Sequence, residues 1–155
     1  MDIDDTLEYA FRGAVASSIG KDGVGFIQCV EELQTVGFRT SVGLVLPILA
    51  SSIDTLVEES DNTDRTIVLV QIIEETSGGT VDWLGYTWPI DIVSGVMYYA
   101  ARASHDLPVP DEDRQTAESI LLSTIILCIA SVLSRGPRRW NRQLDFVEDS
   151  LAAAS

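Results

Sequence analysis

Residues 119–134 read Ser-Ile-Leu-Leu-Ser-Thr-Ile-Ile-Leu-Cys-Ile-Ala-Ser-Val-Leu-Ser, a run without a single charge. Its apolar residues cover all sides of an α-helix, which is typical of a helix buried among neighbours. Glu118 and Arg135 close the run short of the ~20 residues that a bilayer-spanning helix needs. We therefore expect a buried central helix near 119–133. A membrane segment over 119–134 is the alternative, because basic residues and a tryptophan follow the run.

Apolar residues at helical spacing continue on both sides of this run. We expect further helices over residues 3–19, 26–37, 47–60, 66–75, 89–105 and 137–151, and the central helix to begin with the acids 111–113 in its first turn. Residues 66–73 also fit a buried strand, but capping side chains precede them and no second strand offers pairing. The sequence thus predicts an all-α, single-domain globular bundle of about seven helices over residues 1–155.

The composition narrows the class of protein. Apolar residues make up 46% and charged residues 22%, which predicts a packed core instead of disorder. A net charge of −14 argues against binding of nucleic acid or of an anionic membrane, because both need clustered cations. The N-terminus has no signal-peptide pattern, so we expect a cytoplasmic protein or one within a virion assembled there.

No catalytic or cofactor motif stands out. Gly20-Lys21 resembles the end of a phosphate loop, but Val15 replaces the required glycine and Asp22 follows the lysine. His105 is the only histidine, and its position at a helix end beside Asp106 favours a capping role over acid-base catalysis. We therefore predict no catalytic residue and no cofactor.

Neither acids nor cysteines predict a metal site. Asp61 with Asp64, and the acids 111–113, lack the ligand spacing of a calcium loop and fit helix caps. Cys29 and Cys128 share no C-x-x-C spacing and lie in apolar surroundings, so we expect buried, free thiols.

Arginine is concentrated near the C-terminus. Residues 135–142, Arg-Gly-Pro-Arg-Arg-Trp-Asn-Arg, hold four of the ten basic residues, and we call them the arginine cluster. Two expected helices end in paired acids, Glu58-Glu59 and Glu74-Glu75, where the helix dipole prefers cations. These acids form either a solvated face or a surface against which the arginine cluster or a basic partner lies. Candidate partner-binding residues in the cluster are Arg135, Arg138, Arg139, Trp140 and Arg142.

Aromatic residues are concentrated in residues 82–89, Asp-Trp-Leu-Gly-Tyr-Thr-Trp-Pro, which we call the aromatic loop. Trp83, Tyr86 and Trp88 supply more aromatic area than a loop normally leaves in water. They form either a lid over the core of the bundle or an anchor for a partner, because Trp, Tyr and Arg dominate binding hot spots.

These features favour a non-enzymatic, soluble helical protein that binds other protein subunits and forms homo- or hetero-oligomers. It would be a subunit of a larger assembly, such as a viral or phage particle or a defence complex, or an acidic immunity-type inhibitor. One alternative is a small enzyme or ligand-binding bundle with an inter-helix pocket, using Glu74, Glu75, His105 and Tyr98 or Tyr99. Another is a membrane-associated protein that uses 119–134.

Overall fold

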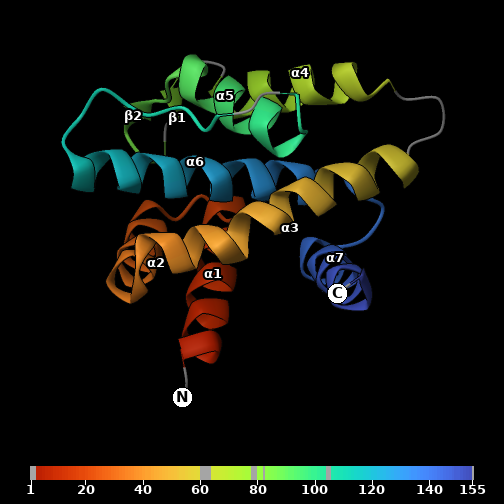
Figure 1. The fold of residues 1–155 in the computed structure, drawn as a ribbon, viewed down its shortest axis with the longest axis horizontal. Helices are drawn as coiled ribbons and strands as arrows, with labels where there is room; N and C mark the ends of the chain where they lie inside the picture. Colours follow the sequence, from red (N-terminus) through yellow and green to blue (C-terminus); the bar gives the residue numbers. More distant parts are fainter. Residues whose placement is uncertain (1–2, 60–63, 78–79, 82, 104–105, 155) are drawn as a thin grey trace.

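A computed structural model describes residues 3–59, 64–77, 80–81, 83–103 and 106–154. Over these residues the chain forms seven helices and a pair of short strands (Figure 1). The helices are α1 (Ile3–Ile19), α2 (Gly23–Val36), α3 (Phe38–Glu59), α4 (Arg65–Ser77), α5 (Ile90–Ala100), α6 (Arg114–Arg135) and α7 (Trp140–Ala154). The predicted all-α bundle is confirmed.

The α6 helix is the centre of the molecule. Every residue from Leu121 to Leu133 is buried, and α6 separates α4 and α5 on one side from α1, α2, α3 and α7 on the other (Figure 1). Such a helix can be apolar all round because each of its faces meets another helix. The predicted buried helix near 119–133 is therefore confirmed.

The α3 helix starts earlier than predicted. We expected Pro47 in the first turn, but α3 begins at Phe38 and carries Pro47 in its interior. A proline there removes one backbone hydrogen bond and crowds the carbonyl of Gly43, four residues earlier. Burial of Val45, Ile48 and Leu49 on the inner face of α3 offsets that cost, so the helix continues through the proline.

The segment 66–73 is helical, as predicted, within α4. The segment after α4 differs from the expected plain loop. Two-residue strands, β1 (Thr80–Val81) and β2 (Tyr86–Thr87), pair antiparallel, with Thr80 opposite Thr87. Gly85 has φ +77°, a left-handed conformation that glycine adopts without strain, and this lets the chain reverse between the strands.

The last three helices begin or end at other residues than predicted. The α5 helix ends at Ala100, before the predicted 105–108 region, and Arg102 turns the chain with φ 63°. The acids 111–113 precede α6 instead of forming its first turn, because Asp113 caps the helix by accepting from the Thr116 backbone N–H at 3.0 Å. The α7 helix begins at Trp140, three residues after the predicted Pro137.

Candidate functional site

Arg135, the last residue of α6, binds the adjacent α4 helix. Its guanidinium forms an ion pair with the Glu75 carboxylate and lies 3.4 Å from the Gln71 amide oxygen. Glu75 is near the C-terminal end of α4, where a cation also offsets the helix dipole. The pair thus ties the end of α6 to the end of α4.

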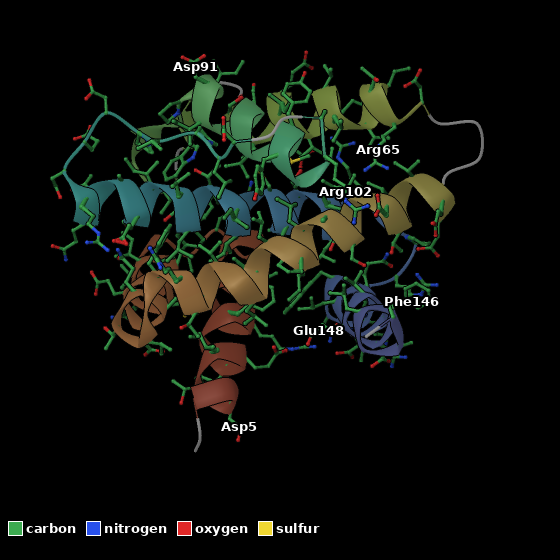
Figure 2. The ribbon with its side chains drawn as sticks, viewed as in Figure 1. Asp5, Arg65, Asp91, Arg102, Phe146 and Glu148 are labelled. Atoms are coloured by element: carbon green, nitrogen blue, oxygen red, sulfur yellow. The ribbon has the colours of Figure 1, made fainter. Side chains whose placement is uncertain are left out.

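Arg138 makes the corresponding contact with α3. Its guanidinium lies 2.9 Å from a Glu59 carboxylate oxygen and 2.9 Å from the amide oxygen of Gln143, and it stacks over the Phe146 ring at 4.1 Å. Figure 2 labels Phe146 on α7. The hydrogen bond from Arg138 lowers the pKa of Glu59 below its ordinary value. Of the two alternatives for the paired acids, the structure thus shows contact with the arginine cluster for Glu59 and Glu75, whereas Glu58 and Glu74 are exposed.

The other residues of the arginine cluster lie differently. Trp140 is half-buried and packs against the core, whereas Arg139 and Arg142 are exposed. Within the described parts of the chain, neither of these two arginines forms an ion pair. Contact of the cluster with a partner stays a prediction, and Arg139 and Arg142 are its accessible guanidinium groups.

The aromatic loop packs against the body of the bundle. Trp88 is buried, and its indole N–H donates to the Thr124 hydroxyl of α6 at 2.8 Å. Trp83 is half-buried and meets Phe26 of α2 edge to face, with ring centroids 5.5 Å apart. A side chain at Gly23 would lie 2.4 Å from the Trp83 carbonyl oxygen, so the loop backbone rests directly on the start of α2. These contacts are those of a lid over the core of the bundle. The side chain of Tyr86 is outside the described residues.

Beside this lid, a groove runs between α2 and the N-terminal half of α6, at the end of the molecule that also carries the β1–β2 hairpin (Figure 1). Its volume is about 860 Å³. Apolar side chains from α2, the aromatic loop and α6 line it: Phe26, Ile27, Val30, Leu84, Trp88, Pro89 and Ile120. At one end the Gln34 amide donates to the Gln115 carbonyl at 3.3 Å and links the two walls. We call this feature the α2/α6 groove.

The charged residues of the α2/α6 groove are all acidic. Among the described residues that line it, Glu31 and Glu112 are the charged ones, and both are exposed. Its remaining polar lining consists of uncharged hydroxyl and amide side chains: Gln34, Thr35, Gln115, Thr116, Ser119 and Ser123. The groove therefore combines an apolar floor with a negative rim.

The groove was not predicted from the sequence, although a signal was present. Phe26 and Ile27 are adjacent apolar residues on α2, and one helix face seldom buries two successive positions. Phe26 is buried, while Ile27 keeps 43% of its surface exposed. An apolar residue just outside the buried stripe could have identified this face of α2.

Of the residues proposed for an enzymatic pocket, Glu74, Glu75, Tyr98 and Tyr99 are described, and none of these four lines the α2/α6 groove. Glu75 is engaged with Arg135, Glu74 and Tyr98 are exposed, and Tyr99 is half-buried elsewhere on the fold. His105 and Asp61 lie outside the described residues. Among the residues that are described, no group of three or more His, Cys, Asp or Glu side chains could hold a metal ion.

The two cysteines differ in burial. Cys128 is fully buried in α6, and burial raises the pKa of its thiol to about 12. Cys29 is only partly buried, which corrects the prediction that both thiols are buried; burial again is the main cause that raises its pKa. Gly13 of α1 covers one side of the Cys29 sulfur so closely that a side chain at position 13 would come within 2.9 Å of it.

A second charged cluster joins α1 to α7. Arg12 binds Glu8 at 2.7 Å on its own helix, and Asp145 at 2.6 Å and Glu148 at 2.8 Å on α7. Figure 2 shows Glu148 on the side of α7 that faces α1. Burial and the neighbouring Glu8 raise the pKa of Glu148 to about 7, although Arg12 acts in the opposite direction. The helical spacing of Glu8 and Arg12 was the one sequence signal for this cluster.

Two helices are long and apolar enough to cross a membrane, by length and composition alone: α3, with a mean hydropathy of 1.6, and α6, with 2.0. In α6, 78% of the most apolar window is buried inside the bundle, as expected for a core helix; in α3 the share is 44%. These two helices are weak evidence for a membrane protein, because core helices of soluble proteins share the same properties.

Two surfaces therefore stand out among the described residues. The α2/α6 groove leaves apolar area and carboxylates exposed, whereas the arginine cluster mainly binds carboxylates of its own chain. A function is argued below from the first surface. No family model matches the sequence, and comparison with curated proteins and with solved structures finds no significant match.

Proposed function

We propose that this chain is a non-enzymatic, soluble protein-interaction protein that binds other protein subunits through the α2/α6 groove. The observation that carries the proposal is the exposed apolar floor of that groove, centred on Ile27. A concave surface that pairs apolar residues with a polar rim is typical of peptide- and helix-binding proteins. In the cell the chain would be one subunit of a larger assembly, or an acidic inhibitor of a partner.

The lining chemistry supports binding over catalysis. A groove of this volume is also large enough for a small molecule. However, the ionisable lining residues Glu31 and Glu112 are exposed carboxylates, and an acid-base pair needs groups whose environments differ. Contact with a protein needs only apolar area and a complementary rim, both of which are present.

The aromatic loop contributes to this surface through its fold. Trp88 and Leu84 line the α2/α6 groove, so the loop forms one wall while it covers the core. We propose that the lid and the interface are one structure, in which a rigid aromatic wall presents its outer edge to the partner. Arg142 on α7 and Arg139, just before that helix, remain candidates for a second contact.

Site-specific photo-crosslinking in cells of the source organism tests the proposal. A benzophenone amino acid is introduced at Ile27 in the groove and, as a matched control, at Tyr9, which is 73% exposed on α1 and lies outside the groove. We expect a crosslinked product that contains a second protein from position 27 and none from position 9. Absence of any such product from position 27 in a folded, expressed chain would refute the proposed interaction.

A further inference from the structure

We infer that the partner segment in the α2/α6 groove is a basic amphipathic helix, whose apolar face covers Ile27 and whose Lys or Arg side chains meet Glu31 and Glu112. This inference rests on the proposed interaction function and names the chemistry of the partner. Helix-in-groove recognition uses apolar anchors along one helix face, and the floor of the groove supplies the complementary apolar surface.

The apolar part of the argument concerns the floor. Phe26 and Val30 are buried and form a base that is packed against α6, while Ile27 stands out from it and Ile120 is half-buried on the opposite wall. A single exposed isoleucine is ordinary on a protein surface. Ile27, however, lies in a groove whose opposite wall is also apolar, so one bound apolar group can displace water from both walls. An apolar side chain inserted between Ile27 and Ile120 would cover both.

The second part of the argument concerns the charged side chains around the apolar floor of the groove. The described lining of the groove includes Glu31 and Glu112 and no basic residue. Arg39 and Arg114 line a neighbouring hollow that also includes Glu112. The ion pair that Arg114 forms is with Glu118, at 3.3 Å, and Arg39 forms none among the described residues. Arg135 lies about 18 Å along the α6 axis from Ser123, the last lining residue on that helix, which is beyond the screening length at physiological salt. A partner must therefore supply the cations itself.

The same charges argue against a second copy of this chain as the occupant. Each copy carries a net charge of −14, so bringing two copies together is opposed at long range. Of the arginines that could serve as the basic element of a second copy, Arg135 and Arg138 are engaged with Glu75 and Glu59. The exposed Arg139 and Arg142 are followed on α7 by the acids Asp145, Glu148 and Asp149. A heterologous basic helix meets neither obstacle.

Fluorescence anisotropy with two defined peptides tests the inference on the purified full chain. The first probe is an amphipathic helical peptide of Leu and Lys, and the second has the same leucine pattern with Glu in place of Lys. We expect the Leu/Lys peptide to bind, the Leu/Glu peptide not to bind, and added salt to weaken binding because the rim charges are exposed.

Substitutions inside and outside the groove test whether the peptide binds there. Ile27→Asp should abolish binding of the Leu/Lys peptide, whereas Ile67→Asp, at a site 54% exposed on α4, should leave it unchanged. Glu31→Gln with Glu112→Gln should weaken binding about tenfold, which corresponds to about 1.4 kcal/mol. The charge-matched control, Glu58→Gln with Glu74→Gln, removes two exposed carboxylates outside the groove and should have little effect. Circular dichroism checks that each variant is folded.

Several results would overturn the inference. These are equal binding of the two peptides, no binding of the Leu/Lys peptide, equal loss of affinity in the two charge-neutralised pairs, or a dimer in light scattering that Ile27→Asp dissociates. The crosslinking experiment separates this failure from failure of the proposed function. A crosslinked partner segment that is neutral or acidic would refute the basic helix and leave the interaction itself established.

Discussion

The two ends of α6 differ in whether the charged and apolar side chains around them have partners within the chain. At the C-terminal end, Arg135 and Arg138 bind Glu75 and Glu59, so the arginine cluster closes the bundle and joins α7 to it. At the N-terminal end, the α2/α6 groove leaves Ile27 and two carboxylates in contact with solvent. The most conspicuous charges of this sequence thus serve its own fold, while the proposed interaction surface consists of ordinary apolar and acidic residues.

At the groove end, the largest expected loss of stability comes from a substitution at Trp88. We expect Trp88→Ala to lower the free energy of unfolding by about 3 kcal/mol or more, because it removes a large buried ring and the hydrogen bond to Thr124. Thr124→Val is the matched control: it keeps the ring and removes the hydroxyl that accepts from Trp88 and donates to the Ile120 carbonyl at 2.6 Å, with an expected loss of about 1 kcal/mol. Urea unfolding followed by circular dichroism measures both.

The outcome for Trp88 also separates the two roles of the aromatic loop. If the ring served only as an anchor for a partner, Trp88→Ala would weaken binding and leave the unfolding midpoint of the isolated chain unchanged. That result would contradict the lid. Loss of stability together with loss of peptide binding is the result expected for a wall that both covers the core and lines the groove.

Substitutions in the arginine cluster should lower the stability less than Trp88→Ala does, and only at arginines that have a partner in the chain. We expect Arg138→Glu to destabilise the fold by about 1 to 2 kcal/mol, because it replaces an attraction to Glu59 with a repulsion and breaks the contact with Gln143. Arg139→Glu introduces the same charge change one residue away, at an exposed side chain, and should be nearly neutral.

Thermal unfolding at low and high salt measures this pair of variants. The difference between them should shrink as salt rises, because screening weakens the interaction with Glu59. Equal melting temperatures for the two variants would show that the ion pairs add nothing to stability and that the cluster is available to a partner.

Most of the fold could be predicted because helix formation follows the apolar period of the sequence. The uncharged run 119–134 alone identified the central helix, and the capping side chains correctly favoured a helix over 66–73. The errors occurred where a local rule competes with packing. Pro47 was expected to begin a helix, yet the burial around it carries α3 through, and the short β1–β2 pairing depends on contacts too local to leave a periodic pattern.

The candidate site was predicted less well. The pairing of the arginine cluster with Glu59 and Glu75 could be anticipated, because the helix dipole favours cations beside acids at a helix C-terminus. The α2/α6 groove could not, because its existence depends on which of two adjacent apolar residues the neighbouring helix covers. That choice is made by the packing of α2 against α6 and is absent from the spacing of either helix.

The junction of α1 with α7 gives the smallest expected effect, seen as a dependence of stability on pH. The pKa of Glu148 is raised from an ordinary value of 4.5 to about 7, by burial first and then by Glu8. The folded state therefore holds a proton in this range that the unfolded state has lost, so the contribution is fully present below 4.5 and is lost as pH rises through about 7. Arg12 contacts the same carboxyl at 2.8 Å and also binds Asp145.

Glu148→Gln should remove this loss, because glutamine resembles the protonated acid and does not titrate. Subtracting its unfolding free energy from that of the wild type at each pH should give a curve that declines from acid to neutral pH and levels off above about 7. Asp149→Asn, at the next and exposed residue of α7, is the control and should give a flat difference. A flat difference for Glu148→Gln as well would mean that Arg12 fully compensates the burial of Glu148. The α7 end would then be held by charge pairs that are insensitive to pH, which would sharpen its contrast with the unpaired carboxylates of the groove.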